Sequence, residues 1–117
     1  MQVGMVYNST SGAPQNFGAV AAPATSGAMV VPVTNRLVTI TPTGACTFNA
    51  GGGGLVGQEM TFLISTSGTS SFTLTFGTNF RKAGTLATGT ANARFFTVNF
   101  ISDGTRWWET SRTAAQT

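Results

Sequence analysis

The residue types that usually carry out catalysis are scarce in this chain. It contains no histidine and one cysteine, and its only acids are Glu59, Asp103 and Glu109. Histidine is the commonest general base in enzymes, and this chain has none. The Ser-His-Asp and Cys-His nucleophile arrangements and nearly all zinc sites are therefore absent. A carboxylate pair for sugar hydrolysis can be drawn from the three acids, but any three acids permit that drawing. We therefore expect a protein that is not an enzyme and that binds no cofactor or metal.

Two local patterns look like functional motifs but fit structural roles better. Gly52, Gly54 and Gly57 have the spacing of G-x-G-x-x-G. A dinucleotide site needs a helix after this motif and an acid about 20 residues later, whereas here a β-rich segment follows and the acid is missing. We expect a turn. Cys46 is the only cysteine and cannot form an intramolecular disulfide, so we expect a protein made in a reducing compartment. We expect the Cys46 side chain to be buried and to act as a small apolar residue.

The basic residues are spread along the chain and do not form a stripe. The net charge is +3, and the bases are Arg36, Arg81, Lys82, Arg94, Arg106 and Arg112. A nucleic-acid-binding face gathers its Lys and Arg in one place, and base stacking would need the neighbouring aromatic residues to be exposed together. We expect no nucleic-acid partner. No apolar stretch has the length of a membrane span and no signal peptide is visible, so we expect no membrane partner either.

Composition changes near residue 34. Residues 1–33 are rich in Gly, Ala, Ser, Asn and Pro and have no sustained period, which predicts an extended N-terminal arm that lies along another surface. From residue 34 short β-rich runs alternate with turn residues. The prediction is an all-β fold, an antiparallel β-sandwich of jelly-roll type over residues 34–113, followed by a C-terminal tail at 114–117.

Period-two alternation divides these runs into an inner and an outer face. We expect strands at residues 37–41 and 45–48. In residues 58–66, alternation places Phe62 on the inner face together with Met60 and Ile64. In residues 71–76 it places Phe72 and Phe76 on the inner face. The Gly- and Thr-rich stretch 77–92 predicts a long loop or short edge pieces anchored by Phe80 and Leu86.

The clearest local prediction is a hairpin over residues 94–110. Asp103-Gly104 lies between two β-rich runs and is a preferred type I′ turn, which sets Phe100 opposite Trp107. One face of the hairpin then carries Phe96, Val98, Phe100, Trp107 and Glu109. The other carries Phe95, Thr97, Asn99, Ile101, Arg106 and Trp108, which is more apolar area than a monomer usually exposes. The predicted core is Phe62, Phe72, Phe76, Phe96, Phe100 and Trp107, and the predicted interface is Phe95, Ile101, Arg106 and Trp108, with Met29 and Val31 from the arm.

Part of the chain resembles β-sandwich modules of tailed-bacteriophage virion proteins, and the likeness is carried by residues 68–80, 84–90 and 100–109. The element D-G-T-x-W-x-E falls at Asp103, Gly104, Thr105, Trp107 and Glu109. Such modules occur in head decoration (cement) proteins and in tail fibres or spikes, and the likeness covers about residues 36–113. The resemblance implies a structural, usually trimeric, non-enzymatic protein.

A module that follows only a short arm is more similar to a decoration protein than to a fibre. The resemblance then implies a homotrimer made in the host cytoplasm that binds the major capsid protein on the virion exterior, at threefold and quasi-threefold positions, and stabilises the head. The alternative is a tail fibre or spike tip that binds a host receptor or glycan, with Phe95 and Trp108 stacking on a sugar ring.

Overall fold

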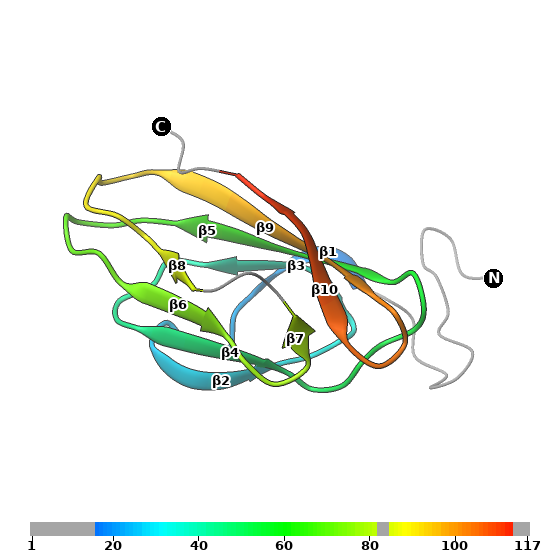
Figure 1. The fold of residues 1–117 in the computed structure, drawn as a ribbon. Coiled ribbons are helices and arrows are strands. Elements are labelled where there is room, and N and C mark those ends of the chain that lie inside the picture. The colour runs from blue at the N-terminus through cyan, green and yellow to red at the C-terminus, as the bar shows by residue number, and fades with distance from the viewer. Residues whose placement is uncertain (1–15, 82–84, 114–117) are drawn as a thin grey trace.

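All regular structure in the described residues is β-strand. The structure is a computed structural model that describes residues 16–81 and 85–113. The strands are β1 (Asn16–Ala21), β2 (Gly27–Val31), β3 (Asn35–Ile40), β4 (Cys46–Ala50), β5 (Glu59–Ser65), β6 (Thr73–Phe76), β7 (Phe80–Arg81), β8 (Leu86–Ala87), β9 (Phe95–Ser102) and β10 (Trp107–Arg112). They form a six-stranded sheet in the order β1-β3-β5-β9-β10-β7 and a four-stranded sheet in the order β2-β4-β6-β8 (Figure 1). The predicted all-β, two-layer fold is confirmed.

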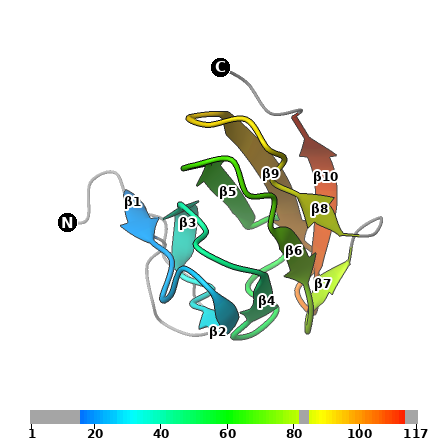
Figure 2. The same cartoon turned by 90° about the vertical axis from the view of Figure 1, so that its left-hand side faces the viewer.

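The chain passes from one sheet to the other at almost every connection. β1, β3 and β5 lie parallel in one sheet and β2, β4 and β6 lie parallel in the other, so the first six strands wind as a coil (Figure 2). Antiparallel pairing, which we expected throughout, occurs between β5 and β9, β9 and β10, and β6 and β8. Strand direction differed from the expectation because alternation of apolar residues reports which face is buried and carries no information on direction.

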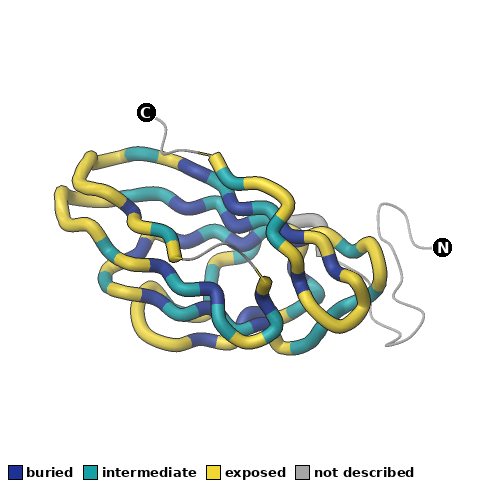
Figure 3. Tube along the Cα trace, in the orientation of Figure 1, coloured by how far each residue is buried: buried dark blue, intermediate teal, exposed yellow. Residues whose placement is uncertain are grey.

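The core lies between the two sheets and is built around phenylalanine. Buried and partly exposed residues alternate along the strands (Figure 3). Five rings, from Phe48, Phe62, Phe76, Phe80 and Phe100, pack with centroids 4.8 to 5.8 Å apart in tilted or edge-on arrangements, the geometry that the ring quadrupole favours. Of the six predicted core residues, Phe62, Phe76, Phe96, Phe100 and Trp107 are buried. Phe72 is half-buried, because it precedes the first residue of β6.

Residues 16–31 belong to the sheets, which corrects the predicted arm and its boundary at residue 34. Two strands occupy this stretch, β1 and β2. Met29 is 6% exposed and Val31 is 0% exposed, so both are core residues and neither is available as an interface. Pro23 and Pro32 fall outside the strands, and β1 and β2 are edge strands, where nearby proline interrupts no inner ladder. Residues 1–15 and 114–117 lie outside the described residues.

Cys46 and the glycine run have structural roles. Cys46 is 2% exposed, its thiol donates to the carbonyl oxygens of Thr25 and Gly44, and burial raises its pKa. Residues 51–58 form a loop that leads into β5, as expected of a turn. In the 77–92 stretch, β7 and β8 are short edge strands, and Phe80 is buried. Within residues 16–81 and 85–113, no helix has the length and apolarity needed to cross a bilayer.

Candidate interaction surface

The connection between β9 and β10 is a four-residue loop. The Asp103 backbone N–H donates to the Arg106 carbonyl oxygen at 3.0 Å, and Asp103 Oδ1 accepts from the backbone N–H groups of Thr105 and Arg106, each at 2.8 Å. Trp107 therefore pairs with Ser102 instead of with Phe100, which corrects the register set by the predicted two-residue turn. The shift is an even number of residues, so each side chain keeps its predicted face.

The glycine-rich loop packs directly against this connection. Trp107 is fully buried, and its indole N–H donates to the Gly52 carbonyl oxygen at 2.8 Å. A Cβ on Gly54 would lie 2.8 Å from Cζ2 of that indole, and one on Gly53 would lie 2.5 Å from the Thr105 backbone. Only glycine allows the backbone to lie this close to Trp107 and Thr105, so residues 51–58 pack against the β9–β10 loop and hold it in position.

Trp108 points to the opposite face of the sheet and is held in place by Asp103. Its side chain is 46% exposed, and its indole N–H donates to Asp103 Oδ2 at 2.7 Å. Hydrogen bonds from the Arg106 backbone, from the Trp108 indole and from the Thr105 backbone lower the pKa of Asp103 to about 2. The carboxylate is thus charged at neutral pH, and the exposed ring is oriented with its polar atom already satisfied.

The predicted interface residues fall into separate places on the outer face. Trp108 lies beside Ile101, which is 38% exposed, and Ile101 pairs in turn with Glu59 on β5. Phe95, 49% exposed, lies at the other end of β9, roughly 20 Å away at about 3.3 Å per residue. Arg106 is exposed in the loop. The structure therefore brings Ile101 and Trp108 together and sets Phe95 apart. We call Ile101 and Trp108 the β9–β10 patch.

A polar row separates the β9–β10 patch from Phe95. Thr61 Oγ1 donates to Asn99 Oδ1 at 2.8 Å, and Asn99 Nδ2 donates to Ser111 Oγ at 2.9 Å. These side chains satisfy one another across β5, β9 and β10. The two apolar ends of this face are therefore distinct surfaces.

Phe95 borders a groove that the sequence did not predict. The groove has a volume of about 450 Å³ and is open to solvent. Its wall is mostly apolar and includes Ala21, Ala22, Ala24, Ile40, Leu63 and Phe95. The small residues of 21–24 are the available signal in the sequence, but they lie within the predicted arm, and the groove arises only because β1 lies beside β3.

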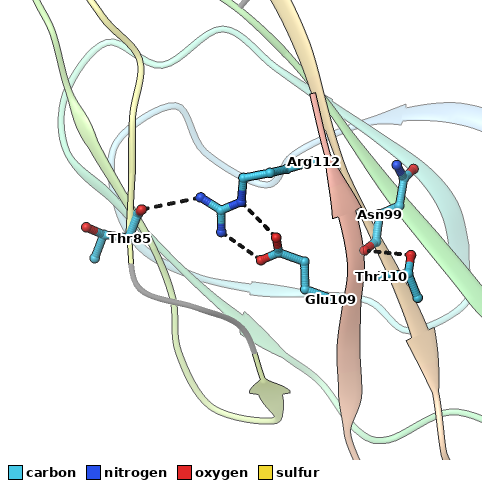
Figure 4. Close-up of polar contacts among 5 residues, drawn as sticks. All are labelled: Thr85, Asn99, Glu109, Thr110 and Arg112. Carbon is cyan, nitrogen blue, oxygen red and sulfur yellow. Dashed lines mark hydrogen bonds and ion pairs between the residues drawn. The ribbon is translucent and has the colours of Figure 1, made fainter. Parts of the chain in front are cut away.

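Glu109 and Arg112 connect the two sheets. Arg112 and Glu109 form a bidentate ion pair, in which Arg112 Nε and Nη2 each donate to a Glu109 carboxylate oxygen at 2.7 Å (Figure 4). Arg112 Nη1 donates to the Thr85 carbonyl oxygen at 3.3 Å. The Glu109 side chain is 11% exposed, and the hydrogen bond that Arg112 donates to Glu109 raises the pKa of Arg112. This pair links β10 to the segment before β8 and leaves the Glu109 carboxylate engaged in structure.

Glu59 and Glu109 lie on opposite faces of the six-stranded sheet. Glu59 lies on the outer face in an ion pair with Arg36 at 3.0 Å, whereas Glu109 faces the interior. Opposite faces of one sheet cannot present a carboxylate pair to one substrate. Among the described residues, no group of three or more His, Cys, Asp or Glu is placed to hold a metal ion.

Comparisons of the chain with protein-family models, with curated proteins and with solved structures find no match. The residues of the D-G-T-x-W-x-E element nevertheless each have a definite place. Asp103 and Gly104 form the loop, Trp107 fills the core, and Glu109 joins the sheets. The element therefore builds the hydrogen-bonded corner that presents Trp108 to solvent.

Proposed function

We propose that the protein is a structural decoration protein of a tailed-phage head, binding the outer surface of the major capsid protein as a homotrimer at threefold and quasi-threefold positions. The observation that carries the proposal is the β9–β10 patch, in which the Trp108 ring is 46% exposed and is hydrogen-bonded to Asp103. The resemblance to virion modules supplies the biological setting. The activity is mechanical, since bound trimers join neighbouring capsid subunits and resist internal pressure.

A fixed, exposed tryptophan suits an interface. Binding energy concentrates in a few aromatic anchors, and a ring already held in its bound orientation loses little entropy when a partner covers it. The indole N–H already donates to Asp103. Covering Trp108 with an apolar partner surface therefore leaves no unsatisfied donor.

The low charge of the protein favours contacts that depend on buried area. With a net charge of +3 spread over separated bases, electrostatic steering is weak. A trimer compensates by avidity, because three modest contacts to neighbouring capsid subunits reinforce one another. We therefore expect binding that depends on the geometry of the expanded shell and changes little with salt.

Two measurements test this proposal. Light scattering after size exclusion should give three times the 12.0 kDa chain mass, and purified protein should bind expanded heads that lack it, near a stoichiometry set by threefold positions, and raise their heat resistance. Trp108→Ala should weaken self-association or head binding. Thr73→Ala, an exposed position on the other sheet, is the matched control. A monodisperse monomer that fails to bind bare expanded heads would overturn the proposal.

The fibre-tip alternative depends on the same tryptophan. An oriented, exposed indole is also a platform for a sugar ring. Phe95 cannot contribute to that platform, because it lies at the far end of β9. Saturable binding to host cells or glycans, lost in Trp108→Ala and independent of any head, would favour the fibre tip over the decoration protein.

A further inference from the structure

The outer face of the six-stranded sheet carries two apolar surfaces that differ in shape. The β9–β10 patch presents the exposed side chains of Ile101 and Trp108, whereas the groove beside Phe95 is a hollow of about 450 Å³. Ala21 in the groove wall and Ile101 are offset by four residues along the strands and by three strand spacings, so they lie roughly 20 Å apart. One copy of the chain therefore cannot bring its own two surfaces together.

The groove has the size and chemistry to receive an aromatic ring. A cavity of about 150 Å³ in a protein interior holds a benzene ring, so a groove of about 450 Å³ has room for an indole and a neighbouring aliphatic side chain. The described residues that line the groove include no charged side chain. The exposed ring of Phe95 at its border offers an edge-on contact to an entering indole.

Polar groups at both surfaces already have partners within the protomer. At the groove, the hydroxyl groups of Thr41 and Ser65 share a hydrogen bond. At the patch, the Trp108 indole N–H donates to Asp103. A polar group that is buried without a partner weakens an interface. Joining the patch to a groove would leave none of these groups without its partner.

The sheet curves between the two surfaces. Figure 2 shows the six-stranded sheet bending over the other sheet, with β1 and β3 on one side and β10 on the other. The groove lies mainly over β1, β3 and β5 and the patch over β9 and β10, so the two surfaces face different directions. Complementary surfaces that face the same way join two copies as a twofold pair, whereas surfaces that diverge lead each copy to a new neighbour and close as a ring.

We infer that in the homotrimer the β9–β10 patch of each copy binds in the groove of the next copy, with the Trp108 ring beside Phe95 of that neighbour. The inference rests on the proposed function for the trimer itself and adds which surfaces meet. Every copy gives a patch to one neighbour and a groove to the other, which is the head-to-tail contact of a threefold ring. Trp108 is thereby assigned to self-association, and contacts with the capsid fall to other surfaces.

Two single variants break this contact from opposite sides. Trp108→Ala removes the ring, and Ala21→Trp fills the groove from an exposed position on the edge strand β1. Light scattering after size exclusion should show that each variant falls from three times the 12.0 kDa chain mass to a monomer. Val30→Ala and Thr73→Trp are the matched controls, because they remove an exposed apolar side chain and add an indole on the other sheet. Both controls should stay trimeric.

The two broken variants should repair each other when they are mixed. Trp108→Ala protein keeps its groove and Ala21→Trp protein keeps its patch, so a mixture has one intact contact and no means of adding a third copy. It should form a pair with one copy of each variant, at twice the 12.0 kDa chain mass, identified by native mass spectrometry. Because the pair lacks ring closure, the mixture is measured at up to about a hundredfold higher concentration than the wild type.

The outcomes separate this contact from the trimer itself. A wild-type trimer, monomeric variants and a mixed pair support the inference, and the mixed pair also shows that both variants are folded. A trimer that persists in either variant, or monomeric variants that form no mixed pair, would overturn the contact and leave the homotrimer in place. A wild-type monomer or dimer would overturn the homotrimer and the contact together.

A second groove variant and a separate binding measurement complete the test. Thr25→Trp fills the groove from the loop after β1 and replaces Ala21→Trp if circular dichroism shows that the latter is unfolded. The same monomer and the same mixed pair are expected from it, and a persistent trimer would contradict the inference. Binding of the wild type to expanded heads tests the decoration role by itself.

Discussion

At the scale of single residues, Trp107 and Trp108 are adjacent in sequence and opposite in role. Trp107 is fully buried and hydrogen-bonded to Gly52, whereas Trp108 is 46% exposed and hydrogen-bonded to Asp103. This contrast follows from the alternation of side chains along β10. One tryptophan therefore stabilises the protomer, and the other is available for contacts between molecules.

Trp107→Ala should lower the free energy of unfolding by about 3 to 5 kcal/mol, because it leaves a large cavity and an unsatisfied Gly52 carbonyl. Trp108→Ala should change protomer stability by less than about 1 kcal/mol and weaken association. Chemical denaturation and solution mass of the two variants check this. Equal destabilisation of both proteins would contradict the assignment of faces.

Asp103 gives the exposed surface a dependence on acid. Its folded pKa of about 2 lies below the unfolded value of about 3.9, so its contribution is fully present above about pH 4 and is lost as the pH falls toward 2. The fluorescence of Trp108 should therefore titrate with a midpoint near 2, with circular dichroism reporting separately on unfolding. D103N should lack this titration and E59Q should retain it. A midpoint near 4 would count against the hydrogen-bonded carboxylate.

Burial of individual residues was predictable from sequence even where pairing was not. The loop between β9 and β10 is longer than the predicted turn, but it moves the register by an even number, so Phe100 and Trp107 stay inside and Ile101 and Trp108 stay outside. The bond from Trp108 to Asp103 does not follow from the predicted register, which sets Trp108 opposite Asn99, whereas in the structure Trp108 pairs with Ile101 and lies closer to Asp103.

At the scale of elements, the loop of residues 51–58 determines how firmly the β9–β10 corner is held. Ser102 exchanges backbone hydrogen bonds with this loop region, its N–H donating to Gln58 and its carbonyl accepting from Gly57, each at 2.8 Å. The Ser102 hydroxyl also donates to the Gly53 carbonyl oxygen. The glycines of residues 51–58 thus allow this loop to lie in close contact with the β9–β10 corner.

Gly54→Ala should destabilise the protein by about 2 to 4 kcal/mol for two reasons: the new Cβ would clash with the Trp107 ring, and position 54 has a positive φ of 68°, which strains alanine. Gly57→Ala is the control: its φ is 84°, but nothing lies within 4 Å of the added Cβ, so only backbone strain of about 1 kcal/mol is expected. Thermal unfolding of the two variants measures the loss of stability in each. Equal losses would show that the contact between position 54 and Trp107 is unimportant.

The elements that sequence reasoning misplaced are β1 and β2. Their stretch contains small residues and two prolines, and neither signal shows whether a segment packs on its own sheet or on a partner. Pairing of β1 with β3 and of β2 with β4 is non-local, and local propensity does not encode it. The groove beside Phe95 was missed for the same reason, because β1 forms one of its walls.

At the scale of the whole molecule, parallel winding makes most sheet pairing non-local. Each of the parallel pairs β1–β3, β2–β4, β3–β5 and β4–β6 needs an intervening strand in the other sheet. Loop closure must therefore precede most of the pairing that stabilises the sheets. The antiparallel pair of β9 and β10 is the exception, since one short loop joins its strands.

Refolding should accordingly be slow for a chain of this size, with time constants of milliseconds to seconds typical of folds with non-local pairing. Stopped-flow fluorescence, dominated by burial of Trp107, measures the rate. W108F removes the exposed fluorophore and should leave the time constant unchanged. Complete refolding within tens of microseconds would contradict the parallel coil.

The alternation of strands between sheets also determines what happens when the backbone is cut. A single cleavage within residues 51–58 would divide the molecule into a piece that ends with β4 and a piece that begins with β5. These pieces meet along two seams, β3 against β5 in one sheet and β4 against β6 in the other. Both layers therefore hold the halves together, and the nicked protein should behave as a noncovalent pair of fragments, each acting as the template on which the other folds.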